Sequence, residues 1–251
     1  MTESKIYIYG KHAISEALTH APESVVRVLM TPDFHDDVLH QLIRKRGITM
    51  GKFDAATVPR EVGDEANHQG ILAQVSLSRL VRPYDVFVEG LTVTPHTALV
   101  LLGEIQDPQN VGAIIRSAAA FGISGVLIPE HNQAPITGAV VKVSAGMAFS
   151  VPLVAIGNVN HTIRDLKERG FWIYGLDEAA PKSITGEQFD APAVFVLGNE
   201  SKGIRLKTQE LCDILLKIPM RAECESLNVA AGSAVALYAW STQHQEALTS
   251  R

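Results

Sequence analysis

The sequence predicts an α/β fold whose carboxyl-terminal part is built on a mainly parallel sheet. Short apolar runs bounded by turn residues alternate with helical patterns along most of the chain. That alternation favours parallel strands covered by helices on both faces. The chain has 251 residues, of which 46% are hydrophobic and 20% charged, so it can form one large globular domain or two smaller ones.

Residues 1–78 are predicted to form a small α/β domain. Apolar runs at Val25–Met30 and Gly70–Leu77 predict strands, and the pattern from His35 to Gly47 predicts a helix. The adjacent cations Arg44 to Arg46 fit either a helix end that favours positive charge or a patch that faces a nucleic acid. The sequence leaves both interpretations open.

Residues 79–96 contain two prolines and scattered charge, which predicts a connector with at most one short strand. We place a second domain at residues 97–251. Its predicted strands are Ala98–Leu102, Gly125–Pro129, Pro152–Ile156, Phe171–Leu176, Ala193–Leu197 and Ile214–Ile218.

Composition argues against several classes of protein. Cys212 and Cys224 form no CxxC pair, so a disulfide framework or a structural metal is not expected, and the nine histidines form no HExxH motif. The amino terminus lacks a signal-peptide pattern, and no apolar run approaches the roughly 18 residues of a membrane span. We therefore expect a cytoplasmic protein without a metal or a membrane anchor. The net charge of −5 limits nucleic-acid contacts to local patches.

The first of three informative segments runs from Asp107 to Gly122. Asp107 and Asn110 are natural turn and cap residues, and Gly122 suits the position after a helix end. Between them a core stripe is predicted at Val111, Ile114, Ile115 and Ala118. Small residues around Arg116 occupy the opposite side, which fits either a tight helix contact with a solvated arginine or a functional surface.

The second segment, Val196 to Ile204, follows an apolar strand and places Gly198 and Gly203 around N-E-S-K. Glycines there let the backbone turn sharply and approach a ligand, although a plain surface turn has the same appearance. Neither GxGxxG nor GxxxxGK[ST] occurs in the chain, so the usual phosphate-binding loops are missing.

The third segment joins the strand that ends at Ile218 to a helix at Val229–Trp240, which is nearly all apolar or small. Ser226 or Asn228 can cap this helix. The helix is too short to span a bilayer, and we expect it to lie in the domain core and partly at a subunit interface. All three segments lie where a strand gives way to a helix, which in open α/β sheets is the usual place for ligands. Together they predict one composite site.

In this order and spacing, N-V-G-x-x-x-R from Asn110 to Arg116, G-N-E-x-x-G from Gly198 to Gly203, and I-P-M with S-L-N-V from Ile218 to Val229 closely resemble the signature motifs of the SpoU/TrmH branch of the SPOUT methyltransferases. The resemblance covers roughly Leu99 to Trp240. The front of the chain, at Ile8–Leu18 and His68–Val75, resembles the amino-terminal RNA-binding domain of the bacterial 23S rRNA guanosine 2′-O-methyltransferases, which is similar in fold to ribosomal protein L30e.

The resemblance implies an α/β-knot catalytic domain with a carboxyl-terminal trefoil knot, S-adenosylmethionine as methyl donor, and a homodimer that acts on RNA. It implies a donor site at Leu197, Gly198, Ile218, Met220, Leu227 and Asn228. It implies catalytic roles for Asn110, Arg116, Glu200, Ser226 and Asn228, with Arg116 reaching the site of the neighbouring subunit. Departures from the common pattern at Ala230 and Ala239 bear on the subgroup rather than on activity.

The proton acceptor is the open point of the implied mechanism. The family proposal makes the arginine a base, but a guanidinium stays protonated at neutral pH. We prefer Arg116 as a cation that binds the adjacent phosphate and stabilises the developing alkoxide, with phosphate, water or Glu200 assisting deprotonation. Cys224 is expected to be structural or incidental, and His68 is expected to be satisfied within its own domain or to contact RNA.

Three further interpretations remain beside 23S rRNA methylation. The same chemistry could act on transfer RNA or another rRNA site, or the chain could be a catalytically silent RNA-binding protein. A nicotinamide oxidoreductase is disfavoured by the missing glycine fingerprint. A dimer would bring local basic patches, including Lys202, Arg205 and Lys207, onto one RNA-facing surface, which predicts steeply salt-dependent RNA binding.

Overall fold

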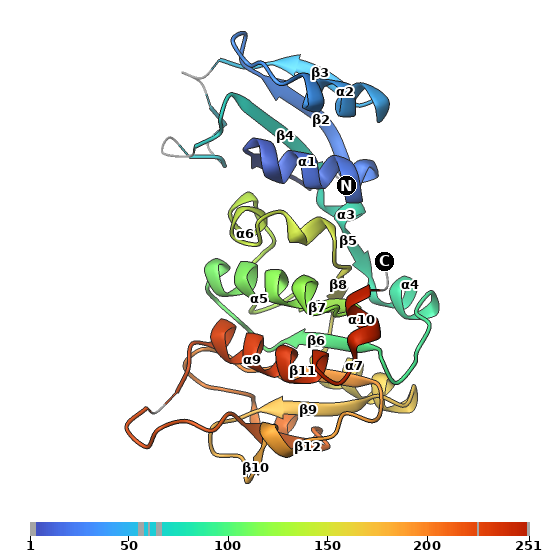
Figure 1. Cartoon of the computed structure of the whole chain (residues 1–251), viewed down its shortest axis with the longest axis vertical. Coiled ribbons are helices and arrows are strands. Elements are labelled where there is room, and N and C mark those ends of the chain that lie inside the picture. Colours follow the sequence, from blue (N-terminus) through green and yellow to red (C-terminus); the bar gives the residue numbers. More distant parts are fainter. Residues whose placement is uncertain (1–3, 55–57, 60, 64–66, 225, 250–251) are drawn as a thin grey trace. The chain divides into compact units, whose positions relative to one another are not determined.

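The computed structural model describes residues 4–54, 58–59, 61–63, 67–224 and 226–249. By their internal contacts these residues form two compact units (Figure 1). The first unit comprises the chain up to Val81 together with Pro135–Ser150, and the second comprises Arg82–Ala134 and the chain from Val151 onward.

The first unit contains a four-stranded sheet in the order β1-β4-β2-β3. Its strands are β1 (Lys5–Tyr9), β2 (Val25–Met30), β3 (Thr49–Lys52) and β4 (Ile71–Ser76). Strand β4 is antiparallel to both of its neighbours, whereas β2 and β3 are parallel. The other elements are α1 (Lys11–His20), η1 (Pro22–Ser24), α2 (Asp37–Lys45), α3 (Leu77–Leu80), α6 (Gly138–Val143) and η2 (Met147–Phe149). The two strands and the helix predicted here are confirmed with boundaries shifted by at most two residues.

Helix α6 joins the first unit although it lies within residues 97–251. Gly138 packs so closely on strand β1 that an added Cβ would come 2.1 Å from the carbonyl oxygen of Tyr7. The ammonium group of Lys142 lies 4.9 Å from the centre of the Tyr9 ring, a cation–π distance. Only a glycine at residue 138 permits this close approach of α6 to β1. The sequence around residue 138 did not indicate that its partner is a strand near the start of the chain.

The second unit is built on an eight-stranded sheet in the order β10-β12-β9-β11-β6-β7-β8-β5. Its strands are β5 (Val81–Pro83, which begins at the last residue of the first unit), β6 (Ala98–Leu102), β7 (Gly125–Pro129), β8 (Leu153–Ile156), β9 (Trp172–Leu176), β10 (Lys182–Ser183), β11 (Ala193–Leu197) and β12 (Ile214–Lys217). From β10 to β8 each strand is parallel to the next. The predicted parallel sheet is confirmed, and its six predicted strands end within one residue of the observed ones.

The helices of the second unit are α4 (Tyr84–Glu89), α5 (Pro108–Ala120), α7 (Val159–Glu168), α8 (Leu206–Gln209), α9 (Val229–Ser241) and α10 (Gln245–Thr249), with a 3₁₀ turn η3 at Ile184–Gly186. Helix α4 lies in the segment that the sequence predicted as a connector. It is held by tertiary contacts, since the Tyr84 hydroxyl donates to the Asp165 carboxylate on α7 at 2.6 Å and Phe87 is buried in the core. A six-residue helix has little stability of its own, which is why the sequence pattern did not show it.

Helices cover both faces of the central strand β6. Leu99 and Leu101 belong to the core cluster that contains Phe87 of α4 and Ile163 of α7. The alternate residues of β6 point to the other face, and all five residues of the strand have no exposed surface. Helices α5 and α9 contact each other and run side by side in Figure 1. The predicted core stripe of α5, Val111, Ile114, Ile115 and Ala118, is fully buried.

None of the helices in the described part of the chain combines the length and the hydropathy that a membrane span needs.

Two histidines join the end of the chain to the rest of the second unit. His244 is buried, and its ring stacks on Trp240 with centroids 4.5 Å apart. Its Nδ1 lies 3.0 Å from Nδ1 of His96, and Nε2 of His96 lies 3.4 Å from the Glu246 carboxylate. Burial, followed by the charge of His96, lowers the pKa of His244, while the Phe189 backbone and Asp190 oppose that shift. The native state therefore favours neutral His244.

We expect the protein to lose stability as the pH falls through about 6.5, the ordinary histidine pKa, because the unfolded chain then binds a proton that folded His244 resists. The contribution of His244 is fully present above that pH. Thermal unfolding midpoints between pH 5.5 and 7.5 measure the effect, and His244→Gln should flatten the profile. His131→Gln, which removes an exposed histidine, is the matched control; an equally steep profile in both variants would contradict this account.

Candidate active site

A cavity of about 670 Å³ lies at the carboxyl ends of β9, β11 and β12 in the second unit. Strand ends in a parallel sheet present free backbone groups and loops, and this volume falls in the range of small-molecule sites. The cavity is lined by all six residues predicted to hold a donor, namely Leu197, Gly198, Ile218, Met220, Leu227 and Asn228. Glu200 and Ser226 of the predicted catalytic set line it as well.

The loop after β11 is shaped by Gly198. A Cβ at this position would lie 2.3 Å from the carbonyl carbon of Gly203 and 2.5 Å from the amide nitrogen of Ile204. The loop closes on itself through the bonds Asn199 N to Gly203 O at 3.0 Å and Gly203 N to Asn199 O at 2.9 Å. Gly203 has a positive φ of 64°, which favours glycine. The two glycines of the motif therefore serve one tight turn.

Glu200 binds this loop to the start of α5. Its Oε1 accepts from the backbone N–H groups of Gln106 and Asp107, both at 3.1 Å, and from Asn110 Nδ2, also at 3.1 Å. Its Oε2 accepts from Gln106 N at 3.2 Å and from Asn199 Nδ2 at 3.4 Å. The carboxylate thus joins the first and second motifs.

Burial raises the pKa of the Glu200 carboxyl, but the side chain of Asn110 and the backbone N–H groups of Glu200, Asp107 and Gln106 outweigh burial and hold that pKa below its ordinary value. A carboxylate with a lowered pKa and with N–H donors on both oxygens is a weak proton acceptor. The geometry favours a positioning role for Glu200 over a role as general base.

Asn110 and Asn228 continue this hydrogen-bond chain to the third motif. Asn228 Nδ2 donates to Asn110 Oδ1 at 2.9 Å, and Asn228 Oδ1 accepts from the backbone N–H groups of Ala230 and Ala231. Asn228 is therefore the cap of α9, one of the two residues the sequence left open. Each donor has a defined acceptor along the path from α9 to Glu200, so both amide groups have one satisfactory orientation.

Arg116 lies away from this group. It is exposed on α5, does not line the cavity, and has no hydrogen bond or ion pair with any residue that the structure describes. Within one chain the fold therefore brings Glu200, Ser226 and Asn228 to the cavity and joins Asn110 to two of them by hydrogen bonds, but it leaves Arg116 apart.

Other lining residues escaped the sequence reasoning. Leu176 is the last residue of β9, Asp177 and Glu178 follow it, and Gln209 comes from α8. Gln209 Nε2 donates to Asp177 Oδ2 at 2.6 Å across the cavity wall. The residues at the end of β9 could have been predicted to line the site, because the sequence predicted this strand and the carboxyl ends of parallel strands share one edge of the sheet.

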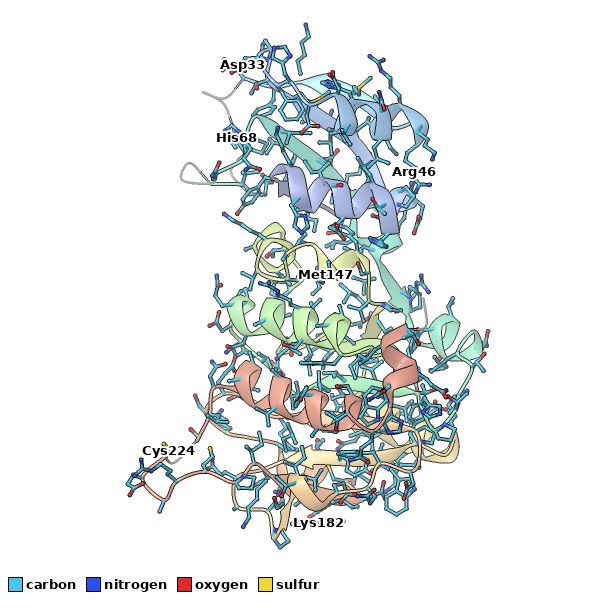
Figure 2. All side chains as sticks on the ribbon, in the orientation of Figure 1. Asp33, Arg46, His68, Met147, Lys182 and Cys224 are labelled. Atoms are coloured by element: carbon cyan, nitrogen blue, oxygen red, sulfur yellow. The ribbon has the colours of Figure 1, made fainter. Side chains whose placement is uncertain are left out.

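The structure also shows the surroundings of the other residues that the sequence analysis singled out. Arg44 and Lys45 occupy the last turn of α2, where the helix dipole favours positive charge. His68 accepts from Gly70 N at 3.0 Å and packs edge-on against Phe53, so it is satisfied within its own unit. Cys224 is exposed on the loop between β12 and α9 (Figure 2). Among the described residues, no group of three or more His, Cys, Asp or Glu side chains could hold a metal.

Comparison with known proteins follows the two predicted regions. The SpoU rRNA methylase family model matches residues 97–238, and a model described as RNA 2′-O ribose methyltransferase substrate binding matches residues 7–81. The chain belongs to the SpoU rRNA methylase family. The predicted SpoU membership is therefore confirmed.

Relatives within the SpoU family match along nearly the whole chain. The 23S rRNA (guanosine-2′-O-)-methyltransferase RlmB of Nitrosomonas europaea is 35% identical over 98% of this chain and 94% of its own. The enzyme of the same name from Shewanella oneidensis is 33% identical over 92% of this chain and 94% of its own. This SpoU protein thus spans both regions of those relatives.

Solved structures share the fold of this SpoU protein. The SpoU methyltransferase AviRb from Streptomyces viridochromogenes, in complex with AdoMet, superposes with a TM-score of 0.80 at 23% identity, covering 96% of this chain and 91% of AviRb. An AdoMet-bound rRNA methyltransferase from Sinorhizobium meliloti gives a TM-score of 0.79 at 20% identity, covering 94% and 86% of the two chains.

The tight loop yields a stability prediction. Gly198→Ala should lower the free energy of unfolding by about 1–3 kcal/mol, because the new methyl group meets backbone atoms that cannot rotate away. Chemical denaturation of the two proteins measures this difference. Gly186→Ala is the matched control, since a Cβ there meets nothing within 4 Å. Equal stabilities of the two alanine variants would show that the loop tolerates a side chain.

Proposed function

We propose that this protein transfers a methyl group from S-adenosylmethionine to the ribose 2′-OH of a guanosine in 23S rRNA. The proposal is supported by SpoU membership and by relatives of that function at 33–35% identity over nearly the full length. The observation that carries it is the hydrogen-bond chain Glu200–Asn110–Asn228, which unites three sequence motifs beside one cavity.

The cavity suits a donor that combines an adenosine with a zwitterionic tail. Leu197, Leu216 and Ile218 provide apolar surface, whereas Asn228, Glu200 and Lys202 provide polar and charged groups. Gly198 and Gly232 also line the cavity. When bound, the donor supplies an electrophilic methyl group on a sulfonium centre. The residues predicted from sequence, Leu197, Gly198, Ile218, Met220, Leu227 and Asn228, would hold it.

The chain's own residues must orient the ribose hydroxyl and stabilise negative charge on its oxygen. Arg116 is an available cation, because its guanidinium is exposed and is not engaged by any described residue. It binds the phosphate beside the target ribose and stabilises the developing alkoxide. Asn110 and Asn228 are held in one orientation by Glu200, and Ser226 adds a hydroxyl at the cavity. The proton leaves to water or phosphate rather than to Glu200.

The separation of Arg116 from the cavity supports a homodimer in which this arginine serves the neighbouring subunit. Val235 and Tyr238 on α9 are 40% and 59% exposed, and an apolar surface on a core helix suits a subunit contact. A dimer also supplies the second RNA-facing surface that a chain of net charge −5 requires.

Within this proposal, residues 1–78 bind RNA through an L30e-like domain, residues 79–96 connect, and residues 97–251 form the catalytic domain. The family models at 7–81 and 97–238 support that division. Membership of the SpoU family supports a trefoil knot at the carboxyl end of the catalytic domain. Methylation of 23S rRNA would take place in the cytoplasm, so the proposed location of the enzyme is cytoplasmic.

The direct test is transfer of labelled methyl from S-adenosylmethionine to unmodified 23S rRNA and, in parallel, to bulk transfer RNA, followed by mapping of the modified nucleotide. We expect one 2′-O-methylguanosine in 23S rRNA. Label in transfer RNA alone would keep the chemistry and overturn the substrate. Donor binding without transfer to free rRNA or to ribosome assembly intermediates would favour a catalytically silent RNA-binding protein.

Arg116 gives a test of the shared site. Arg116→Ala should lower the single-turnover rate by about 10²-fold or more, because a charge-stabilising group is lost. Arg116→Lys keeps the charge but loses the planar fork, so it should recover part of that rate. Near-wild-type transfer by Arg116→Ala would overturn this role.

Mixing two inactive variants locates Arg116 in the dimer. Arg116→Ala and Asn110→Ala, refolded together, should form mixed dimers in which one site holds both wild-type residues. Activity should then rise to a sizeable fraction of wild type. If the mixture stays as inactive as the separate variants, Arg116 acts within its own chain.

A further inference from the structure

The loop between β6 and α5 contains a non-glycine residue in an unusual conformation. Glu104 has a φ of 65°, in the left-handed region that side chains other than glycine, asparagine and aspartate seldom occupy. Such a conformation persists only where surrounding contacts hold it, and it is common near functional sites. The preceding Gly103 is pressed against β11, since a Cβ there would lie 2.3 Å from the Leu197 carbonyl oxygen.

Both the backbone and the side chain of Glu104 are held from the loop after β11. Its carbonyl oxygen accepts from Asn199 Nδ2 at 2.8 Å and from Gln106 Nε2 at 3.1 Å. Its carboxylate forms a bidentate ion pair with the Arg205 guanidinium, with Nε 3.0 Å from Oε2 and Nη2 2.7 Å from Oε1. A two-pronged guanidinium–carboxylate pair fixes direction as well as distance.

This pair lies two residues from groups that orient the candidate site. The N–H groups of Gln106 and Asp107, which follow Glu104, donate to Glu200. Arg205 lies two residues after Gly203, which closes the turn with Asn199. A change at Glu104 or Arg205 would therefore shift either the donors to Glu200 or the loop that carries Glu200.

We infer that Glu104 and Arg205 form a clamp whose role is to position Glu200, and through it Asn110 and Asn228, for methyl transfer. This inference rests on the proposed function. The clamp is a positioning device, because neither residue lines the cavity. It also reassigns Arg205, which the sequence placed in an RNA-facing patch with Lys202 and Lys207. The Arg205 side chain is 67% exposed, so the pair is solvated and its value lies in geometry more than in stability.

A double-mutant cycle tests the clamp. Glu104→Gln, Arg205→Gln and the double variant are compared with wild type by single-turnover methyl transfer to unmodified 23S rRNA. Each single variant should be slower by about 10-fold, since small misplacements near reacting groups carry large costs in rate. The double variant should be no slower than either single variant, because the same contact is lost. The reversed pair, Glu104→Arg with Arg205→Glu, should recover part of the rate.

A second readout separates positioning from general damage. Calorimetric affinity for S-adenosylhomocysteine should change much less than the rate of methyl transfer, and the thermal unfolding midpoint should stay near wild type in all variants. Arg169→Gln is the matched control: it removes a forked ion pair with Asp165 of the same exposed kind in the same unit, and its rate should equal that of wild type. Should Arg205→Gln unfold, the cycle is repeated with Arg205→Lys and Glu104→Asp, which keep charge but alter the fork.

The outcomes are distinct. Wild-type rates in the single variants, or a double variant slowed by the product of the single effects, would overturn the clamp while leaving the proposed function intact. Parallel losses of donor affinity and melting temperature would assign the pair a structural role and also overturn it. Wild-type protein that methylates no RNA would overturn the proposed function itself, and the clamp with it.

Discussion

The candidate site depends on the carboxylate of Glu200, which accepts hydrogen bonds on both of its oxygens. Glu200 lies on the loop after β11, and the groups that bind it come from the start of α5 and from that loop. Because Asn110 donates to Glu200, its amide oxygen faces Asn228, whose own oxygen then caps α9. These hydrogen bonds fix the relative positions of three segments that lie up to 118 positions apart in sequence. A neutral amide at residue 200 would turn a donor toward N–H groups and break that order.

The same interaction explains why Glu200 is poorly suited to accept a proton. The hydrogen bonds that hold the Glu200 side chain in place also lower its pKa, so the same contacts that position the carboxylate make it a weaker base. In the proposed mechanism the positive charge comes instead from Arg116, which is exposed on α5. Charge stabilisation and geometric order are therefore assigned, in that proposed mechanism, to residues of two different motifs, Arg116 of the first and Glu200 of the second. That division is compatible with a site completed by two subunits.

The backbone conformation of the loops after β6 and β11 holds the hydrogen-bonding groups of the candidate site in place. Gly103 allows the ends of β6 and β11 to meet at a distance that a Cβ would forbid, and Gly198 allows an equally close approach within the loop after β11. The left-handed residue Glu104 and the turn from Asn199 to Gly203 then project the hydrogen-bonding groups toward one another. Each of these features has a bonded partner in the neighbouring loop, so the strain in one loop is offset by contacts with the other.

The sequence by itself determined the α/β class, the six main strands of the second unit, the core face of α5 and the SpoU family, because apolar periodicity and short motifs are local properties. Only the tertiary structure decided that α6 belongs with the first unit, that α4 forms in the expected connector, and that Glu104 pairs with Arg205, 101 positions away. It also decided which of Ser226 and Asn228 caps α9, and that Glu200 is surrounded by donors. These outcomes depend on residues far apart in the chain, whose proximity the local pattern does not encode.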